Sequence, residues 1–189
     1  MVHKPIPIIP INRTAMIIGL CVLLVSGRVL AHAHIFIDYS VEAVFNGEHL
    51  GGFRATWTFD RMFSSFIIKQ FDTDRDGRFD TNESQAVFRE SFRNLEKNNY
   101  FTYIRIDDKK QPLPPIENFT AEIVPGKKVI RYTFFLPLNI PVTPDMRRAT
   151  IFFFDPVIYV SFTVTKNDVS IVKNSDSIDT VFRLQRVKF

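Results

Sequence analysis

The sequence predicts an α+β fold that is mostly β, an antiparallel β-sandwich with one inserted helix–loop–helix. Short runs rich in β-branched and aromatic residues alternate apolar and polar side chains along much of the chain, which is typical of half-buried strands. Turn-forming pairs such as Asn46-Gly47 separate these runs. One stretch instead repeats its apolar residues every three or four positions, which indicates helices.

The strand-like runs lie on both sides of the helical stretch. Residues 35–45 and 53–59 are expected to pair as a hairpin across Asn46-Gly47, because both turn residues tolerate a positive φ angle. The later strands are expected at residues 101–106, 119–124, 129–138, 150–154 and 157–165. The polar segment 166–180 is expected to be a loop, and residues 181–189 a last strand or a tail.

The helical stretch is the insert, at about residues 61–97. Asp60 is a suitable N-cap for its first helix. The apolar face of that helix consists of Met62, Phe63, Phe66, Ile67 and Phe71. The second helix is expected from about Asn82 to Lys97, with an apolar face of Val87, Phe88, Phe92 and Leu95. The acidic segment between the two faces is therefore expected to be a loop that two helices hold.

The composition favours one domain. A chain of 189 residues with 46% hydrophobic content can build one core, and its 20 phenylalanines are expected to lie mostly inside it. The formal charge of +4 depends on Lys4, Arg13 and Arg28, because without these three the 24 basic residues fall to 21, against 20 acidic ones. No stripe of Lys and Arg alternates with aromatic residues, so a nucleic-acid partner is not expected.

The first 31 residues are expected to be a secretory signal peptide, which places the mature domain, residues 32–189, in the periplasm. Their uncharged run, Thr14–Gly27, is shorter than the roughly 20 residues that span a bilayer core. Small residues allow cleavage after Ala31 or after Ala33, and an uncleaved membrane anchor is the alternative. Cys21 is the one cysteine, so cleavage would leave no disulfide, thiolate catalysis or cysteine-based metal site.

The segment Asp72–Glu83 has the twelve-residue spacing of an EF-hand calcium loop. Calcium needs about six to eight oxygen ligands, which a short loop supplies by wrapping around the ion. The expected ligands are the side chains of Asp72, Asp74, Asp76, Asp80 and Glu83 and the backbone carbonyl of Arg78. Gly77 permits the sharp turn, and Phe79 is expected to point into the core. The alternative is an acidic surface turn that binds nothing.

Three histidines follow Ala31, namely His32, His34 and His49. If cleavage makes His32 the terminus, its amine, two backbone amides and the His34 imidazole form a square of nitrogens suited to Cu²⁺ or Ni²⁺. Paired imidazoles of His32 and His34 with His49 are a second option. The alternative is that these are polar residues at a frayed terminus.

Several segments together resemble a bacterial family described as an uncharacterised transport-system periplasmic component, whose members are often encoded beside nickel/cobalt permeases. The segments are His32–Asp38, Trp57–Ser64, the acidic loop, Tyr100–Asp107, Phe134–Leu138 and Phe154–Tyr159. The resemblance implies a calcium loop in a sandwich, and an inner-membrane metal permease as partner. The usual family start resembles His-Pro-His, and a proline there would forbid the square of nitrogens, so that site is not a family property.

The function expected from these observations is an exported calcium-binding accessory of a nickel/cobalt-type transport system. The alternative is a calcium-stabilised interaction module with no transition-metal role. An enzyme is not expected, because no Ser-His-Asp grouping, phosphate loop or zinc motif is evident and the clustered carboxylates are accounted for as calcium ligands. No small-molecule substrate is evident either.

Overall fold

The computed structural model describes residues 34–143, 145, 146, 148–157 and 159–173. All of them belong to one of the chain's two units, His32–Phe189. The signal peptide expected at residues 1–31, the candidate ligand His32 and the strand or tail expected at residues 181–189 lie outside the described residues. No helix of the described part is both long and apolar enough to cross a membrane.

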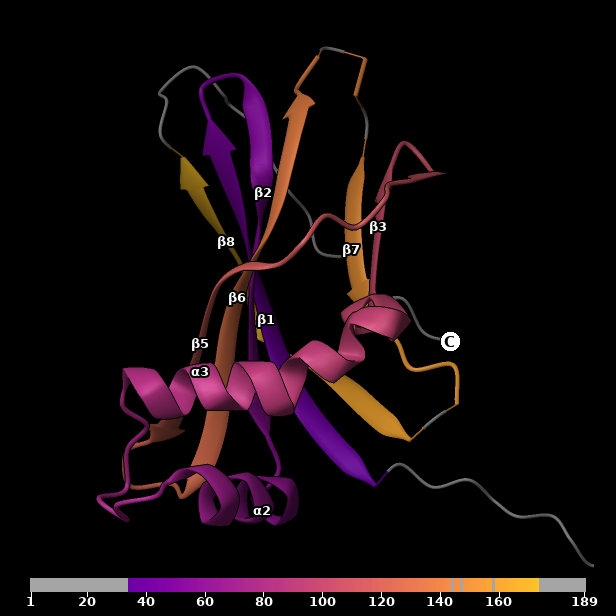
Figure 1. The fold of residues 1–189 in the computed structure, drawn as a ribbon. Coiled ribbons are helices and arrows are strands. Elements are labelled where there is room, and N and C mark those ends of the chain that lie inside the picture. The colour runs from indigo at the N-terminus through magenta and orange to yellow at the C-terminus, as the bar shows by residue number, and fades with distance from the viewer. Residues whose placement is uncertain (1–33, 144, 147, 158, 174–189) are drawn as a thin grey trace, which may run out of the picture. The chain divides into compact units, whose positions relative to one another are not determined.

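The fold is mostly β, as the sequence predicts, and its larger sheet has five strands in the order β5-β6-β2-β1-β8 (Figure 1). The strands are β1 (Ile35–Asn46), β2 (His49–Phe59), β5 (Glu117–Val124), β6 (Val129–Pro141) and β8 (Val160–Lys173). The hairpin expected across Asn46-Gly47 is present, and Gly47 has a φ of 58°. β5 and β8 form the two edges of this sheet.

A second sheet has three strands in the order β4-β3-β7, with β3 at Thr102–Ile106, β4 at Lys109–Lys110 and β7 at Ala149–Phe153. Aromatic rings connect the two sheets. The ring of Trp57 on β2 lies 5.3 Å from that of Phe153 on β7, and Tyr39 on β1 lies 4.8 Å from the same ring. Trp57 is fully buried, so these contacts belong to the core, where the phenylalanine-rich composition places them.

Two expectations about β8 are wrong. First, β8 pairs with β1 in parallel, so the larger sheet is mixed rather than antiparallel. Second, strand structure continues through residues 166–173, where a loop is expected. The polar residues Asn167 and Asp168 indicate a turn, but they lie within a register shift of the β1–β8 pairing. Val164 lies opposite Tyr39 and Val169 opposite Val41, so β8 has extra residues at this point.

The insert between β2 and β3 begins at the residue that the sequence predicts, but Met62 and Phe66 of the expected apolar face are exposed. Asp60 caps α2 (Arg61–Phe71) by accepting hydrogen bonds from the backbone N–H groups of Met62 and Phe63. After the loop, α3 runs over Thr81–Glu90. The helix expected to reach Lys97 therefore ends early, and the 3-10 helix η1 (Phe92–Phe101) follows it. Its last residues, including Asn99 with a φ of 50°, leave helical geometry, which asparagine tolerates.

Candidate metal centre

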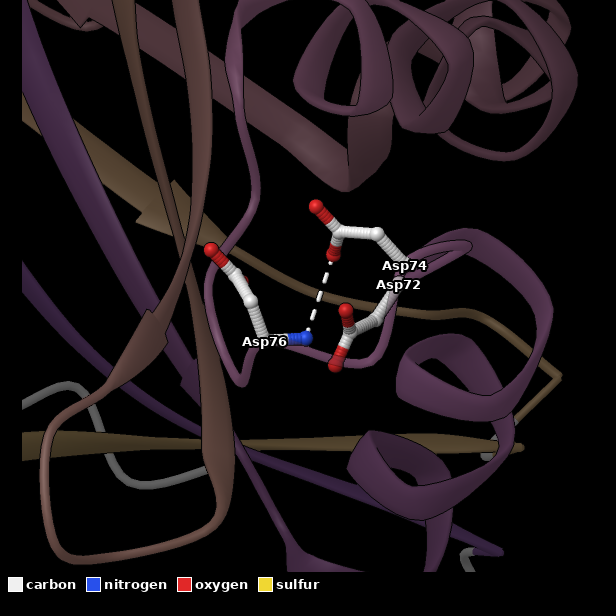
Figure 2. Close-up of side chains that lie close together, drawn as sticks. All are labelled: Asp72, Asp74 and Asp76. Carbon is white, nitrogen blue, oxygen red and sulfur yellow. Dashed lines mark hydrogen bonds between the residues drawn. The ribbon is translucent and has the colours of Figure 1, made fainter.

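The loop between α2 and α3 brings three carboxylates together. Each of Asp72, Asp74 and Asp76 offers one ligand oxygen, and these oxygens all lie within 4.8 Å of one another. Figure 2 shows the three side chains turned toward a common space inside the curve of the loop. Asp72 is the C-cap of α2 and Asp80 is the N-cap of α3, so both ends of the loop are fixed to helices.

Hydrogen bonds within the loop explain this curvature. Each carboxylate accepts a backbone N–H from further along: Asp74 from Asp76 at 3.1 Å, Asp76 from Arg78 at 2.7 Å, and Asp72 from Gly77 at 3.2 Å. Asp side chains fold short segments back in this way. Gly77 has a φ of 81°, in the left-handed region where glycine has no steric cost, as its predicted role requires.

The Asp72 carboxylate tests whether the site fits a cation. Asp72 is only 8% exposed, and its Oδ1 atom is buried with no hydrogen-bond partner among the described residues. Burial of an ionised oxygen without a partner is costly, and paired or metal-bound charges avoid that cost. No ion pair of the described residues involves Arg75 or Arg78, so neither guanidinium is within ion-pair distance of the loop's acids. The residues present therefore fit a cation.

Glu83 is the second buried acid of the site, also 8% exposed. Its Oε1 accepts hydrogen bonds from both the N–H and the hydroxyl of Thr73, each at 2.7 Å, and its Oε2 accepts one from the Asp80 N–H at 3.2 Å. Asp80 in turn accepts the Glu83 N–H at 2.8 Å, which completes a capping box. The Thr73 hydroxyl, followed by the backbone donors, holds the pKa of Glu83 below its usual value despite burial.

Arg78 and Phe79 are the remaining loop residues with a predicted role. Arg78 is exposed, and its N–H is the donor to Asp76; its carbonyl is the atom expected to face a cation. Phe79 is half-buried and packs against the core, in the direction that the sequence predicts. The sequence pattern does not predict the hydrogen bonds from Thr73 to Glu83, because the second position of the loop is not a ligand in the expected scheme.

The structure places His34 and His49 far apart. His34 is exposed just before β1, where its N–H donates to the Tyr159 carbonyl at 2.8 Å and its ring lies 5.0 Å from the Tyr159 ring. His49 pairs with Asn46 at the opposite end of β1. A strand of 12 residues spans about 40 Å, so the paired-imidazole site that includes His49 with His34 is wrong. β1 begins at Ile35, and the square of nitrogens depends on His32, outside the described residues.

Comparison with known proteins identifies relatives but no activity. The family described as "Protein of unknown function (DUF1007)" matches residues 17–183. An uncharacterized protein of Haemophilus influenzae is 29% identical over 143 residues, which are 75% of this chain and 66% of that protein, slightly under two thirds of its length. An "Uncharacterized 15.5 kDa protein in trpE 3'region" of Spirochaeta aurantia is 26% identical over 110 residues, 58% of this chain and 76% of that protein. No solved structure matches the chain.

Proposed function

We propose that this chain, which belongs to the DUF1007 family of unknown function, is an exported calcium-binding protein whose insert is an EF-hand. One observation carries the proposal: one carboxylate oxygen each of Asp72, Asp74 and Asp76 lies within 4.8 Å of the others, and the buried Asp72 Oδ1 has no hydrogen-bond partner among the described residues. A hard cation with oxygen ligands suits such a site, and calcium accepts the flexible ligand set that a loop offers.

The residues that would hold calcium are the side chains of Asp72, Asp74, Asp76, Asp80 and Glu83 and the carbonyl of Arg78. When bound, calcium would neutralise the acids and tie α2 to α3. Because calcium would bind only the folded loop, it would add its binding free energy to stability. The proposed role of the ion is therefore that of a structural staple within a β-sandwich of the two sheets.

The wider role is proposed from the sequence. The N-terminal pattern supports export to the periplasm, and the resemblance to transport-system components supports an accessory of a nickel/cobalt-type permease. In this role His32 and His34 would take Ni²⁺ or Cu²⁺ at the mature terminus. The exposed position of His34, at the start of the described domain, is compatible with a site that a partner reaches.

A second candidate is a calcium-stabilised interaction module without a transition metal. Two exposed apolar side chains on α2 favour it: Met62 is 69% and Phe66 is 63% exposed, and they lie one helical turn apart. Titration of the mature protein with Ni²⁺ and Cu²⁺ separates the candidates. Tight binding of one ion per chain supports the transport accessory, whereas no binding supports the interaction module.

The calcium proposal is tested by calorimetric titration of wild type and Glu83→Gln. Loss of the charged carboxylate that closes the loop is expected to weaken calcium binding by about a hundredfold. Glu90→Gln is the matched control, because Glu90 is an exposed residue at the end of the same helix and is expected to leave affinity unchanged. Equal affinity of Glu83→Gln and wild type would contradict the assignment of the loop.

A further inference from the structure

The helix that follows the loop contacts the edge strand β5 of the larger sheet. Among the described strands, β5 pairs with β6 alone, so one side of its backbone has no strand partner in the part of the chain that the structure describes. On that strand, the N–H of Ala121 donates to the hydroxyl of Ser84 on α3 at 2.8 Å, across 37 residues of sequence. Figure 1 shows α3 lying across β5 and β6. Ser84 therefore satisfies one backbone N–H on the open side of this edge strand.

The helix that precedes the loop does the same for the neighbouring strand. The hydroxyl of Ser64 on α2 accepts the N–H of Ile130 at 3.0 Å, where β6 has run past its last paired residue on β2. Ser64 is fully buried, and its hydroxyl also donates to the Phe59 carbonyl at 3.4 Å. Each helix of the insert therefore satisfies one backbone group that the strands leave unpaired.

Ser84 is joined directly to the candidate metal centre. It follows Glu83, the last expected ligand, and its N–H donates to the Asp80 carbonyl at 2.9 Å in the first turn of α3. The capping box fixes Asp80 and Glu83 in that same turn. A shift of this turn that moves the Glu83 carboxylate would move the Ser84 hydroxyl as well. The rings of Phe88 and Phe119, 5.2 Å apart, hold the next turn of α3 on β5.

We propose that Ser84 is a positioning residue for calcium binding, and that calcium binding and capping of the Ala121 amide on β5 are one coupled equilibrium. This inference rests on the proposed function. Without calcium, the Asp72 Oδ1 that has no partner among the described residues and the repulsion among the loop's acids favour an open loop, which loosens the first turn of α3. With calcium, that turn is fixed and Ser84 caps Ala121. Coupling is reciprocal, so weakening the cap must weaken calcium binding.

The first test is calorimetric titration of Ser84→Ala with calcium. Loss of one hydrogen bond to a sheet amide is expected to weaken calcium binding by about three- to tenfold, although Ser84 is not an expected ligand. Ser65→Ala is the matched control, because the Ser65 hydroxyl donates only within α2, to the Arg61 carbonyl at 2.8 Å. Ser84→Thr, which keeps the hydroxyl, is expected to restore wild-type affinity.

The second test follows the Ala121 amide by hydrogen exchange in the wild-type protein, so it depends on no variant. Calcium is expected to slow its exchange about tenfold or more over chelated protein, whereas an amide in the β1–β2 pairing such as Ala55 is expected to change less. If calcium binds and Ala121 exchange does not respond, or if Ser84→Ala binds like wild type, the coupling is wrong while the proposed function stands. If wild type binds no calcium, both are wrong.

Discussion

The loop between α2 and α3 and the start of β1 both carry metal-ligating side chains, but the fold treats them differently. In the loop, Asp72, Asp74 and Asp76 come from five consecutive residues, and hydrogen bonds to nearby N–H groups bring their oxygens within 4.8 Å. At the start of β1, His34 is exposed and its ring contacts Tyr159, while His49 begins β2, opposite Asn46 at the far end of β1.

The difference shows what each kind of site needs. A loop site is assembled by its own short segment, and α2 and α3 only have to hold its two ends. A site made of His34 and a distant residue needs the sheet to bring the two together. The sheet instead places His49 beside Asn46, at the end of β1 opposite from His34. The loop also includes a buried oxygen, Oδ1 of Asp72, that has no hydrogen-bond partner among the described residues, whereas no buried atom of this kind marks the described histidines.

Removal of calcium should have the largest effect. At a hundredfold excess over its dissociation constant, a ligand of the native state adds about 2.7 kcal/mol to stability. For a domain of this size, chelation is then expected to lower Tm by roughly 5–10 °C, and calcium to restore it. Thermal unfolding followed by circular dichroism measures this shift. Nickel at the same excess is expected to leave Tm unchanged. If neither chelator nor calcium changes Tm, the loop does not stabilise the fold by binding calcium and does not differ from the histidines in this respect.

Asp72→Asn should separate stability from binding. The neutral amide removes the charge that Asp72 shares with its partnerless Oδ1, and its oxygen can still accept the Gly77 N–H. In chelator, the free energy of unfolding is expected to rise by about 1 kcal/mol, while calcium affinity falls at least about tenfold. Urea denaturation and titration measure the two quantities. Asp38→Asn, at an exposed position on β1, is expected to change neither, and a less stable metal-free Asp72→Asn protein would contradict the reasoning.

The smallest effect on stability is expected at the histidines. Mature protein that begins at His32 is expected to bind one Cu²⁺ or Ni²⁺ with the d–d absorption band of square-planar nitrogen ligation, without a change in Tm. His34→Ala is expected to abolish the band. His49→Ala is expected to leave it intact, because His49 on β2 lies beside the end of β1 that is far from His34. A terminus at His34, found by Edman sequencing, would remove the square of nitrogens altogether.

Local sequence patterns predicted the parts of the fold that depend on neighbouring residues. The hairpin at Asn46-Gly47 and the helix capped by Asp60 lie where their turn and cap residues place them. Pairings between strands that are distant in sequence could not be predicted from local patterns. The parallel pairing of β8 with β1 depends on which edge is free after the other strands have paired, and its irregularity absorbs Asn167 and Asp168, which indicate a turn in isolation.

The site divides in the same way. The twelve-residue spacing predicted the three converging carboxylates, because the loop's own hydrogen bonds assemble them. The roles of Thr73 and Ser84 were missed. Thr73 reaches Glu83 across ten residues, and Ser84 meets Ala121 only because the chain returns as β5 beside α3. Neither contact leaves a periodic pattern in the sequence.

Native mass spectrometry of the protein purified from the cell envelope tests the central claim most directly, because it counts bound ions and gives the mass of the mature chain. The proposed site requires one calcium ion per wild-type chain and none on Asp72→Asn under the same conditions. Wild-type protein that carries no calcium in its presence, or an Asp72→Asn protein that carries as much as wild type, would contradict the assignment of Asp72–Glu83 as a calcium-binding loop.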